Sequence, residues 1–212
     1  VKCFYLLWLL ENIWAILPFI QISNKMIDTK ELIRNILEAI GEDPDREGLL
    51  DTPKRVIKSW ETLFGGYHQR PEDVLTTQFN EDYKSMVICD NIEFYSTCEH
   101  HLLPFYGICH IAYIPTKKII GLSKMPRLVD LYARRLQVQE RLTEQIANSL
   151  MNFLDPLGVG VIIKSKHLCM VCRGVQKRHA TMITSSIKGI FFQPNVKEEF
   201  INLVGLKSRS LE

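Results

Sequence analysis

The chain has 212 residues, of which 46% are hydrophobic and 24% are charged. Such values are ordinary for a globular protein with one sizeable domain and an appended segment. The formal net charge of +2 says little about nucleic acid, whose binding would need a local basic patch. We expect neither a nucleic acid nor a membrane as partner. Six cysteines in a chain of this length do not indicate a disulfide scaffold, and reduced thiols in a cytoplasmic protein are the better interpretation.

The first 25 residues differ from the rest of the chain. Residues 4–22 are strongly apolar, but Glu11, Asn12 and Pro18 interrupt them. The segment is marginal as a membrane span and lacks the small-residue cleavage site of a signal peptide. Two interpretations stay open, an upstream extension of the reading frame and an apolar arm that packs on a partner subunit.

Two amphipathic helices are predicted next. Asp28 and Glu31 resemble a capping box, and the apolar positions that follow repeat with helical spacing up to Gly41. The second helix is predicted to begin at Pro53, which is tolerated in a first turn, and to end at Gly65.

The remaining pattern predicts long strands with helices between them. We expect strands over residues 86–97 (one bent strand or two short ones), 105–114, 158–174 and 181–192, and helices over residues 124–135, 138–153 and 196–204. Strands and helices do not alternate regularly in this order. The pattern therefore predicts an α+β fold with a mainly antiparallel sheet.

Two short clusters of thiols and imidazoles indicate a metal site. Cys98 and His101 are three residues apart, which is close enough to chelate one ion, and Cys169 could supply a third ligand from a distant segment. Three protein ligands leave a tetrahedral zinc ion with an open position, as in catalytic sites. His100 and His167 would then be free imidazoles for proton transfer.

The predicted strand 158–174 would place His167 and Cys169 on the same face, because side chains two residues apart in a strand point the same way. His100 and His101 are adjacent and should have different roles. The alternative interpretation is two unrelated polar spots with reduced, packed cysteines.

A basic helix start is the second informative feature. Ser123 is a candidate helix cap, and Lys124 and Arg127 follow it in the first turn. Cations are unfavourable there unless an anion binds, because the helix dipole is already positive. The segment therefore indicates a phosphate site, and the alternative is a solvated basic helix end. Further positive charge could come from three other residues, Arg55, Lys58 and Arg173.

Several stretches resemble the GTP cyclohydrolase I family, and together they span about residues 26–205 in order. They are Gly-Glu-Asp-Pro-Asp-Arg-Glu-Gly-Leu (41–49), Thr-Pro-Lys-Arg-Val (52–56), Ser-Thr-Cys-Glu-His-His (96–101), Gly-Leu-Ser-Lys (121–124), Gln-Val-Gln-Glu-Arg-Leu (137–142) and His-Leu-Cys-Met-Val-Cys-Arg-Gly-Val (167–175).

The resemblance implies the tunnelling fold, and we expect a helical segment at 26–85 and a catalytic domain at 86–205. They are flanked by the apolar extension at 1–25, which has no counterpart in the family's common core, and by a tail at 206–212. The resemblance also implies a toroidal homo-oligomer, typically a decamer built from pentamers, in the cytoplasm. The implied activity is the zinc-dependent conversion of GTP to 7,8-dihydroneopterin triphosphate and formate, the first step of pterin and tetrahydrofolate biosynthesis.

Site residues follow from the same resemblance. It implies that zinc is held by Cys98, His101 and Cys169, and that His100 and His167 are the acid/base residues. Read alone, Glu140 is a solvated helix carboxylate, but the resemblance implies that it holds guanine and that the neighbouring Gln139 is also a substrate contact. The implied triphosphate contacts are Ser123, Lys124, Arg127, Arg173, Arg55 and Lys58.

One loop departs from the family pattern, because residues 177–180 read Lys-Arg-His-Ala where Pro-Gly-Ser is common after the basic residue. The contacts of this loop are therefore open. Two other functions remain: a non-catalytic, zinc-stabilised nucleotide-binding module, and another tunnelling-fold pterin or deazapurine enzyme, such as a nitrile reductase with a cysteine nucleophile. The first would have no use for His100 and His167, and the two-part zinc signature and the Ser-Lys motif count against the second.

Overall fold

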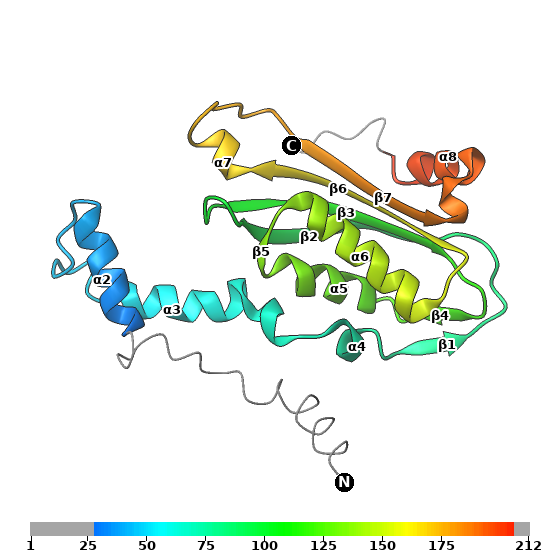
Figure 1. Cartoon of the computed structure of the whole chain (residues 1–212), viewed down its shortest axis with the longest axis horizontal. Coiled ribbons are helices and arrows are strands. Elements are labelled where there is room, and N and C mark those ends of the chain that lie inside the picture. Colours follow the sequence, from blue (N-terminus) through cyan, green and yellow to red (C-terminus); the bar gives the residue numbers. More distant parts are fainter. Residues whose placement is uncertain (1–27, 206–212) are drawn as a thin grey trace, which may run out of the picture. The chain divides into compact units, whose positions relative to one another are not determined.

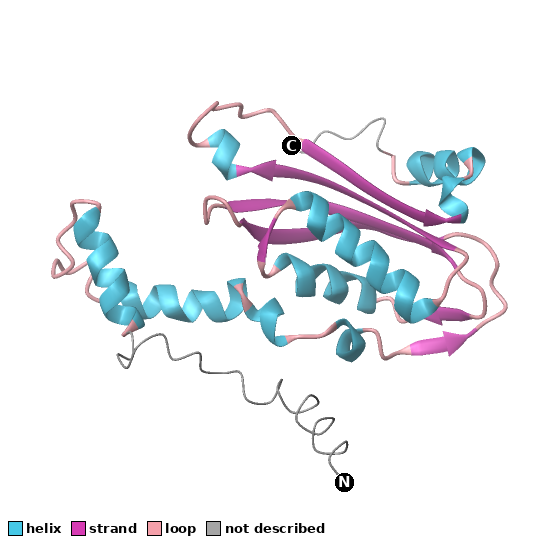
Figure 2. Cartoon of the chain, in the orientation of Figure 1, coloured by secondary structure: helices cyan, strands magenta, loops and turns pink. Residues whose placement is uncertain are grey.

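The computed structural model describes residues 28–205, so the segments predicted at 1–25 and 206–212 lie outside the described residues. The chain divides into two compact units between Ile57 and Lys58. Figure 1 labels the elements, and Figure 2 separates helices from strands. No helix among residues 28–205 is both long and apolar enough to cross a membrane.

The first unit contains helix α2 (Thr29–Ala39) and the start of α3 (Thr52–Leu63). Asp28 caps α2, as predicted, and its carboxylate accepts a hydrogen bond of 2.9 Å from the backbone N–H of Lys30. Gly41 follows the helix with a φ of 91°, a conformation that costs glycine little. Both helices that the periodicity predicts in this region are therefore confirmed.

The second unit is built on a five-stranded sheet with the strand order β5-β2-β3-β6-β7. Its long strands are β2 (Val87–Cys98), β3 (Pro104–Ile114), β6 (Gly158–His167) and β7 (Met182–Gly189). They pair antiparallel, whereas the short β5 (Leu136–Gln137) pairs parallel with the end of β2. The predicted α+β class with a mainly antiparallel sheet is confirmed.

The segment 86–97 forms one bent strand. Pairing between β2 and β3 shifts register between Cys89 and Ile92, and Asn91 has a φ of 53° at this irregularity. An extra residue in one strand bends it and strengthens its twist. The sequence was compatible with one bent strand or with two short strands, and the structure shows a single strand with a bulge.

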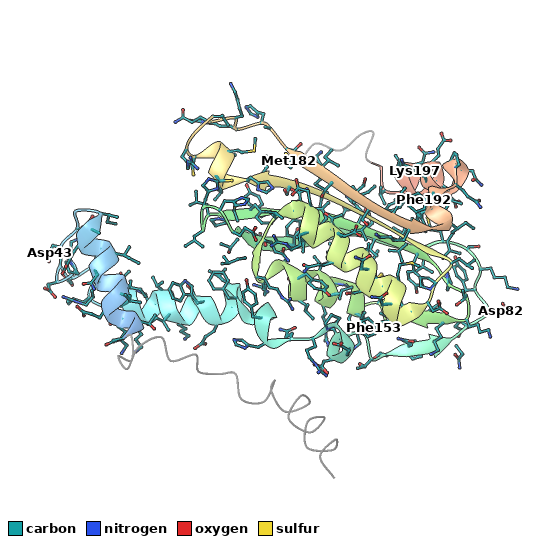
Figure 3. The ribbon with its side chains drawn as sticks, viewed as in Figure 1. Asp43, Asp82, Phe153, Met182, Phe192 and Lys197 are labelled. Carbon is teal, nitrogen blue, oxygen red and sulfur yellow. The ribbon has the colours of Figure 1, made fainter. Side chains whose placement is uncertain are left out.

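Two helices cover one face of the sheet (Figure 3), and their buried apolar residues belong to the main core. They are α5 (Lys124–Ala133) and α6 (Gln139–Leu154). Leu128, Leu142 and Ile146 are fully buried, and each contributes about 1.5–3 kcal/mol by burial. On the other face, η3 (Ile190–Phe192) and α8 (Pro194–Leu203) form a smaller core around Phe191 and Phe200.

The predicted strand 158–174 is too long. β6 ends at His167, and the chain turns at once into the one-turn helix α7 (Leu168–Val171). The apolar run continues through both elements, so periodicity alone could not separate them. Other short elements were not predicted: η2 (Gly65–His68), α4 (Pro71–Val74), and the two-stranded sheet of β1 (Gln78–Asn80) and β4 (Lys118–Ile120).

Candidate functional site

A tight turn after β2 brings His101 back to Cys98. The backbone N–H of Cys98 donates to the carbonyl of Leu103 at 2.8 Å, and the carbonyl of Cys98 accepts from Leu102 at 2.9 Å. Leu102 has a φ of 53°, which closes the turn. As a result, the Sγ atom of Cys98 lies 3.5 Å from Nδ1 of His101.

Cys169 joins this pair from the first turn of α7. Its sulfur and the donor atoms of Cys98 and His101 all lie within 4.8 Å of one another. Burial raises the pKa of the Cys169 thiol, and the neighbouring Cys98 raises it further because two thiolates repel. A cation between the two sulfurs would relieve that repulsion.

The spacing of these donors fits a tetrahedral metal ion. With metal–sulfur and metal–nitrogen bonds of about 2.3 and 2.1 Å, sulfur and nitrogen should lie about 3.6 Å apart. The separation of 3.5 Å between Cys98 and His101 is close to that value. The structure thus brings together the three residues that the sequence singled out as ligands, although Cys169 reaches them from a helical turn and not from the expected strand.

An ion pair anchors the turn that carries two of these donors. The guanidinium of Arg141 on α6 contacts both carboxylate oxygens of Glu99, one of them at 3.0 Å. This contact holds the pKa of Glu99 below its usual value. The backbone N–H of Glu99 also donates to Gln137 of β5 at 3.1 Å, so the turn is tied to α6 and to its neighbouring strand.

His167 is held on two sides at the end of β6. Its ring stacks on Phe105 of β3, with centroids 4.5 Å apart and an angle of 3° between the planes. Its Nε2 atom lies 2.9 Å from Oε1 of Gln139, the first residue of α6. Burial lowers the pKa of His167, which favours the neutral imidazole.

The Gln139 side chain fixes which nitrogen of His167 carries the proton. Its amide nitrogen donates to the carbonyls of Ile163 and Met182 at 3.1 and 3.2 Å. Carbonyls only accept, so the amide oxygen must face Ser165 and His167. Nε2 of the neutral His167 is therefore the donor, and its Nδ1 carries the lone pair.

His100 has a different environment from His167. Its side chain is 65% exposed, and its Nε2 atom lies 3.8 Å from a carboxylate oxygen of Glu99. The His100 and His101 rings are 6.2 Å apart and nearly perpendicular. The adjacent histidines therefore point differently, as the sequence indicated, and His100 is free to meet a bound molecule.

Glu140 and Arg173 are exposed near the same end of the sheet. Glu140 follows the buried Gln139 in the first turn of α6, where a carboxylate is favoured by the helix dipole. Arg173 follows α7 and lies in a stretch in which every residue from 172 to 180 is exposed.

The predicted phosphate residues at the start of α5 lie at the opposite end of the sheet. The N–H of Ile120, just before them, donates to the Tyr113 hydroxyl near the end of β3, whereas His167 stacks on Phe105 near its start. Eight residues of strand separate these two points, or about 26 Å. Figure 1 shows α7 and β4 at these two ends.

The side chains of the predicted phosphate residues at that end are exposed or only partly covered. Ser123 occupies the N-cap position of α5, but its side chain makes no capping hydrogen bond. The Lys124 ammonium lies 3.5 Å from the hydroxyl of Thr76, and Arg127 is exposed. Within the second unit, the single chain does not bring these residues to the three-donor cluster.

The remaining two basic residues lie on α3. Arg55 belongs to the first unit, where it contacts the carbonyl of Gly48 at 3.3 Å and Asp51 at 3.9 Å. Lys58 is exposed and begins the second unit.

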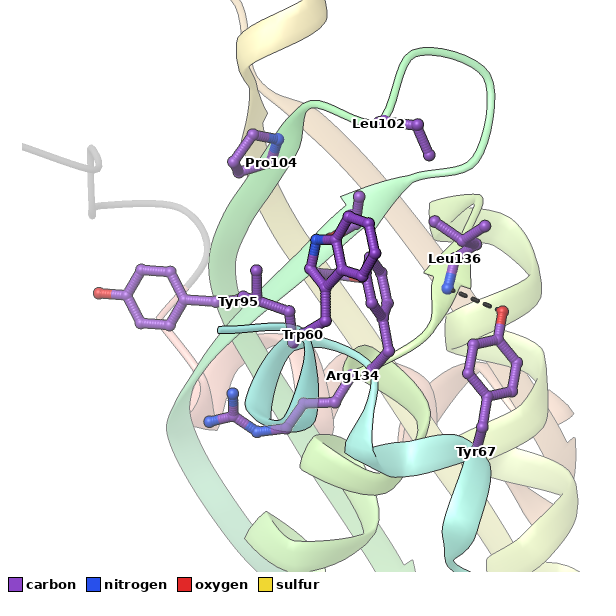
Figure 4. A pocket seen from close by; sticks show the side chains of 11 residues that line it. Trp60, Tyr67, Tyr95, Leu102, Pro104, Arg134 and Leu136 are labelled. Carbon is purple, nitrogen blue, oxygen red and sulfur yellow. Dashed lines mark hydrogen bonds between the residues drawn. The ribbon is translucent and has the colours of Figure 1, made fainter. Parts of the chain in front are cut away.

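A mainly apolar cavity of about 770 Å³ adjoins the turn that carries the donors (Figure 4). Trp60, Phe64 and Tyr95 are among its lining residues, together with Leu102 of the turn itself. The Tyr67 hydroxyl accepts a hydrogen bond of 3.0 Å from the backbone N–H of Leu136 at its edge. Such a lining suits apolar groups and not a triphosphate.

The residues that position the site are not predictable from the sequence. Gln139 and His167 lie 28 residues apart, and Glu99 and Arg141 lie 42 residues apart, so no local pattern links the members of either pair. One signal was available for Gln139, since this polar residue stands directly before a buried apolar helix face.

Comparisons with known proteins identify the family of this chain. The family model of GTP cyclohydrolase I matches residues 29–205. GTP cyclohydrolase 1 of Leptospira biflexa is 55% identical over 177 residues, covering 82% of this chain and 97% of the relative. The Campylobacter jejuni and Wolinella succinogenes proteins of the same name are 52% and 50% identical, with 93% and 97% of their lengths covered. The curled sheet with packed helices is the tunnelling fold, and the chain belongs to the GTP cyclohydrolase I family.

Proposed function

We propose that the protein converts GTP to 7,8-dihydroneopterin triphosphate and formate with the help of zinc. The relatives named GTP cyclohydrolase 1 support the reaction. The observation that carries the proposal is a set of three metal donors, Cys98, His101 and Cys169, beside the oriented imidazole of His167. Three ligands from protein leave a position for water or substrate, as in catalytic zinc sites.

Zinc is the proposed metal because two thiolates and one imidazole are a donor set that it prefers. When bound, it would make water a stronger nucleophile near neutral pH and polarise an oxygen of the substrate. Water must attack C8 of guanine to open the five-membered ring, and the resulting formamide must be hydrolysed to release formate. Two thiolates reduce the charge of the ion, which increases the need for imidazoles that transfer protons.

His167 is the proposed proton carrier at this centre. Its lowered pKa keeps the ring neutral, and the bond from Nε2 to Gln139 leaves Nδ1 as the basic nitrogen. Stacking on Phe105 prevents the ring from turning away. A base that is already oriented can transfer a proton without an unfavourable rearrangement of its side chain beforehand.

His100 is the second proposed acid/base residue. Its exposure and its position on the turn of the metal donors allow it to contact a bound nucleotide. Each of the two histidines could serve ring opening or the later rearrangement of the sugar.

Glu140 is the proposed anchor for guanine. Its two oxygens suit the neighbouring N1–H and N2–H donors of that base, and adenine lacks this pair. Its place in the first turn of α6, next to the residue that holds His167, puts the carboxylate beside the proposed reaction centre. A site that pairs with these donors should reject ATP strongly, because adenine would leave the carboxylate unpaired.

A homo-oligomer is proposed because, within one chain, the candidate metal donors and the implied triphosphate contacts lie at opposite ends of the sheet. The implied triphosphate contacts Ser123 and Lys124 lie about 26 Å along β3 from the His167 end, and one GTP cannot reach both within a chain. A second copy could bring its α5 to the first copy's donors. Arg173 would then add charge from the metal side.

Exposed apolar residues support an assembly of several copies. Leu32, Ile36 and Ile40 form one stripe of α2, and each is between 46% and 69% exposed. On β2 and β3, the exposed rings of Tyr95 and Tyr106 stack with centroids 6.0 Å apart. Contiguous apolar surface of this kind is typical of interfaces. We propose a decamer built from pentamers, in the cytoplasm, where the thiols of the metal site stay reduced.

The direct test is to incubate the purified, zinc-loaded protein with GTP and to measure formate. The proposal predicts formate and a pterin triphosphate in equal amounts. Zinc-loaded protein that binds GTP but releases no formate would contradict the proposal and favour a nucleotide-binding module. Light scattering on the same sample measures the size of the oligomer.

A further inference from the structure

A second thiol follows the metal donor Cys169 after one helical turn. Cys169 and Cys172 form a Cys-x-x-Cys motif that begins in α7 and ends at its C-cap. Cys172 is exposed, and its thiol donates to the backbone carbonyl of Leu168 at 2.9 Å. Neither the proposed reaction nor the packing of the core uses this thiol.

Cys172 is not a fourth ligand in this conformation. The group of donor atoms within 4.8 Å of one another contains Cys98, His101 and Cys169, and it does not include Cys172. Its thiol is turned back over the helical turn toward Leu168. An exposed thiol with no role in the proposed reaction therefore lies one helical turn from a proposed metal ligand.

We propose that Cys169 and Cys172 are a disulfide-forming pair, and that their oxidation removes one ligand from the metal site. The inference rests on the metal site of the proposed function. It assigns to Cys172 a role that the conversion of GTP does not require.

The geometry of the helical turn allows this bond. Residues three apart in an α-helix have Cα atoms about 5 Å apart, which lies within the range of disulfides, about 4.4–6.8 Å. Their Cβ atoms begin about 5–6 Å apart and must approach to about 4 Å. Only the end of a one-turn helix has to tighten, because the residues from 172 to 180 after it are all exposed.

The step needs an oxidant, and a low-molecular-weight disulfide is sufficient. The exposed Cys172 thiolate attacks one sulfur of that disulfide, so a mixed disulfide forms and one small thiolate leaves. The Cys169 sulfur then attacks the Cys172 sulfur and expels the second small thiolate. Two protein thiols become one disulfide, and the two electrons that they lose reduce the small disulfide to two thiols.

The consequence for the metal follows directly. A sulfur in a disulfide is no longer a thiolate, and the thiolate is the form that binds metals. Cys98 and His101 would remain as two ligands, which is fewer than a protein zinc site normally has. Reduction of the disulfide would restore the third ligand.

Other described thiols are poorer candidates for the first attack. Cys109 is fully buried, and burial raises the pKa of its thiol far above the usual value. Cys89 is half-buried, and burial raises its pKa as well. Exposed thiols react with small disulfides more readily than buried ones.

The test treats zinc-loaded protein with oxidised glutathione and follows two readouts that do not depend on activity. Released zinc is measured with a colorimetric chelator, and the peptide with residues 169–172 is examined by mass spectrometry without reduction. The proposal predicts that this peptide loses two hydrogen atoms as zinc appears. In Cys172→Ser, zinc release should be at least about tenfold slower, because the exposed attacking thiol is gone.

Cys89→Ser is the matched control, and it should release zinc like the unchanged protein. A reductant with added zinc should reverse the effect. Equal zinc release in Cys172→Ser would overturn the proposal, and so would a disulfide between Cys98 and Cys169 in the oxidised protein. Loss of zinc from Cys172→Ser without oxidant would also overturn it, because Cys172 would then be a ligand. Absence of formate production would affect the proposed function alone, since neither readout involves GTP.

Discussion

The two ends of the main sheet differ in how firmly one chain holds its polar side chains. At the end with Cys98 and His167, stacking and hydrogen bonds fix the imidazole, and the Glu99–Arg141 ion pair holds the turn. At the other end, the side chain of Ser123 makes no capping hydrogen bond with α5. One chain therefore brings the three candidate metal donors and His167 together by itself, whereas under the proposed function the phosphate contacts would come from a partner copy.

The largest effect should follow from removing a metal donor. In Cys169→Ser, both zinc and formate production should be lost, because only Cys98 and His101 remain as donors. Elemental analysis measures the metal, and Cys89→Ser serves as the control. Full zinc occupancy in Cys169→Ser would show that the cluster is not the metal site.

The next effect separates the two free histidines from the ligands. His167→Ala should keep its zinc and its oligomer while formate release falls by a factor of about 100 or more, which is the usual contribution of an acid/base group. His100→Ala should also keep zinc and lose activity, and the exposed His68→Ala is the control. Near-normal turnover in both of the first two variants would remove the acid/base role.

Recognition of guanine gives a third test at the same end of the sheet. Glu140→Gln keeps the size of the side chain but replaces one acceptor oxygen with a donor, so it should weaken GTP binding by about 10-fold or more. The zinc content should not change. If GTP affinity is unaffected, then Glu140 is only a solvated residue of the first turn of α6.

A smaller effect should follow from releasing His167. Gln139→Leu removes the acceptor for Nε2 together with the other hydrogen bonds of this amide. The lost bond to His167, worth about 1–1.5 kcal/mol, should lower kcat about tenfold, and the other lost bonds should lower the stability of the protein. KM for GTP should stay nearly constant, because the residue acts through the imidazole. A raised KM with unchanged kcat would instead make Gln139 a substrate contact, as the resemblance implied.

The sequence predicted much of the fold and the identity of the clustered donors. Periodicity located the long helices, because their apolar faces pack on the sheet, as at Leu142 and Ile146. It failed after His167, where an apolar run changes from strand to helical turn without a change in composition. Short elements such as β5 depend on pairing with a distant strand, which no local pattern reports.

The site was predictable where motifs carry their own chemistry, and not where distant residues position one another. The spacing of Cys98 and His101 predicts a metal site, and the structure brings both residues close to Cys169. The orientation of His167 depends on Gln139 and on a stacked ring from another strand, and only the folded chain shows this.

The most direct test of the central claim, that one active site joins opposite ends of two copies, mixes two inactive variants. Cys169→Ser destroys the metal end, and Lys124→Glu reverses the charge at the phosphate end. After unfolding and reassembly together, about a quarter of the sites should combine two intact halves, because copies mix at random in a symmetric oligomer. The account predicts that formate production recovers to that level, whereas zinc stays at about half occupancy because all three metal donors belong to one chain. If each site were built within one chain, no intact site could form, and activity that stays at the sum of the separate variants would contradict the account.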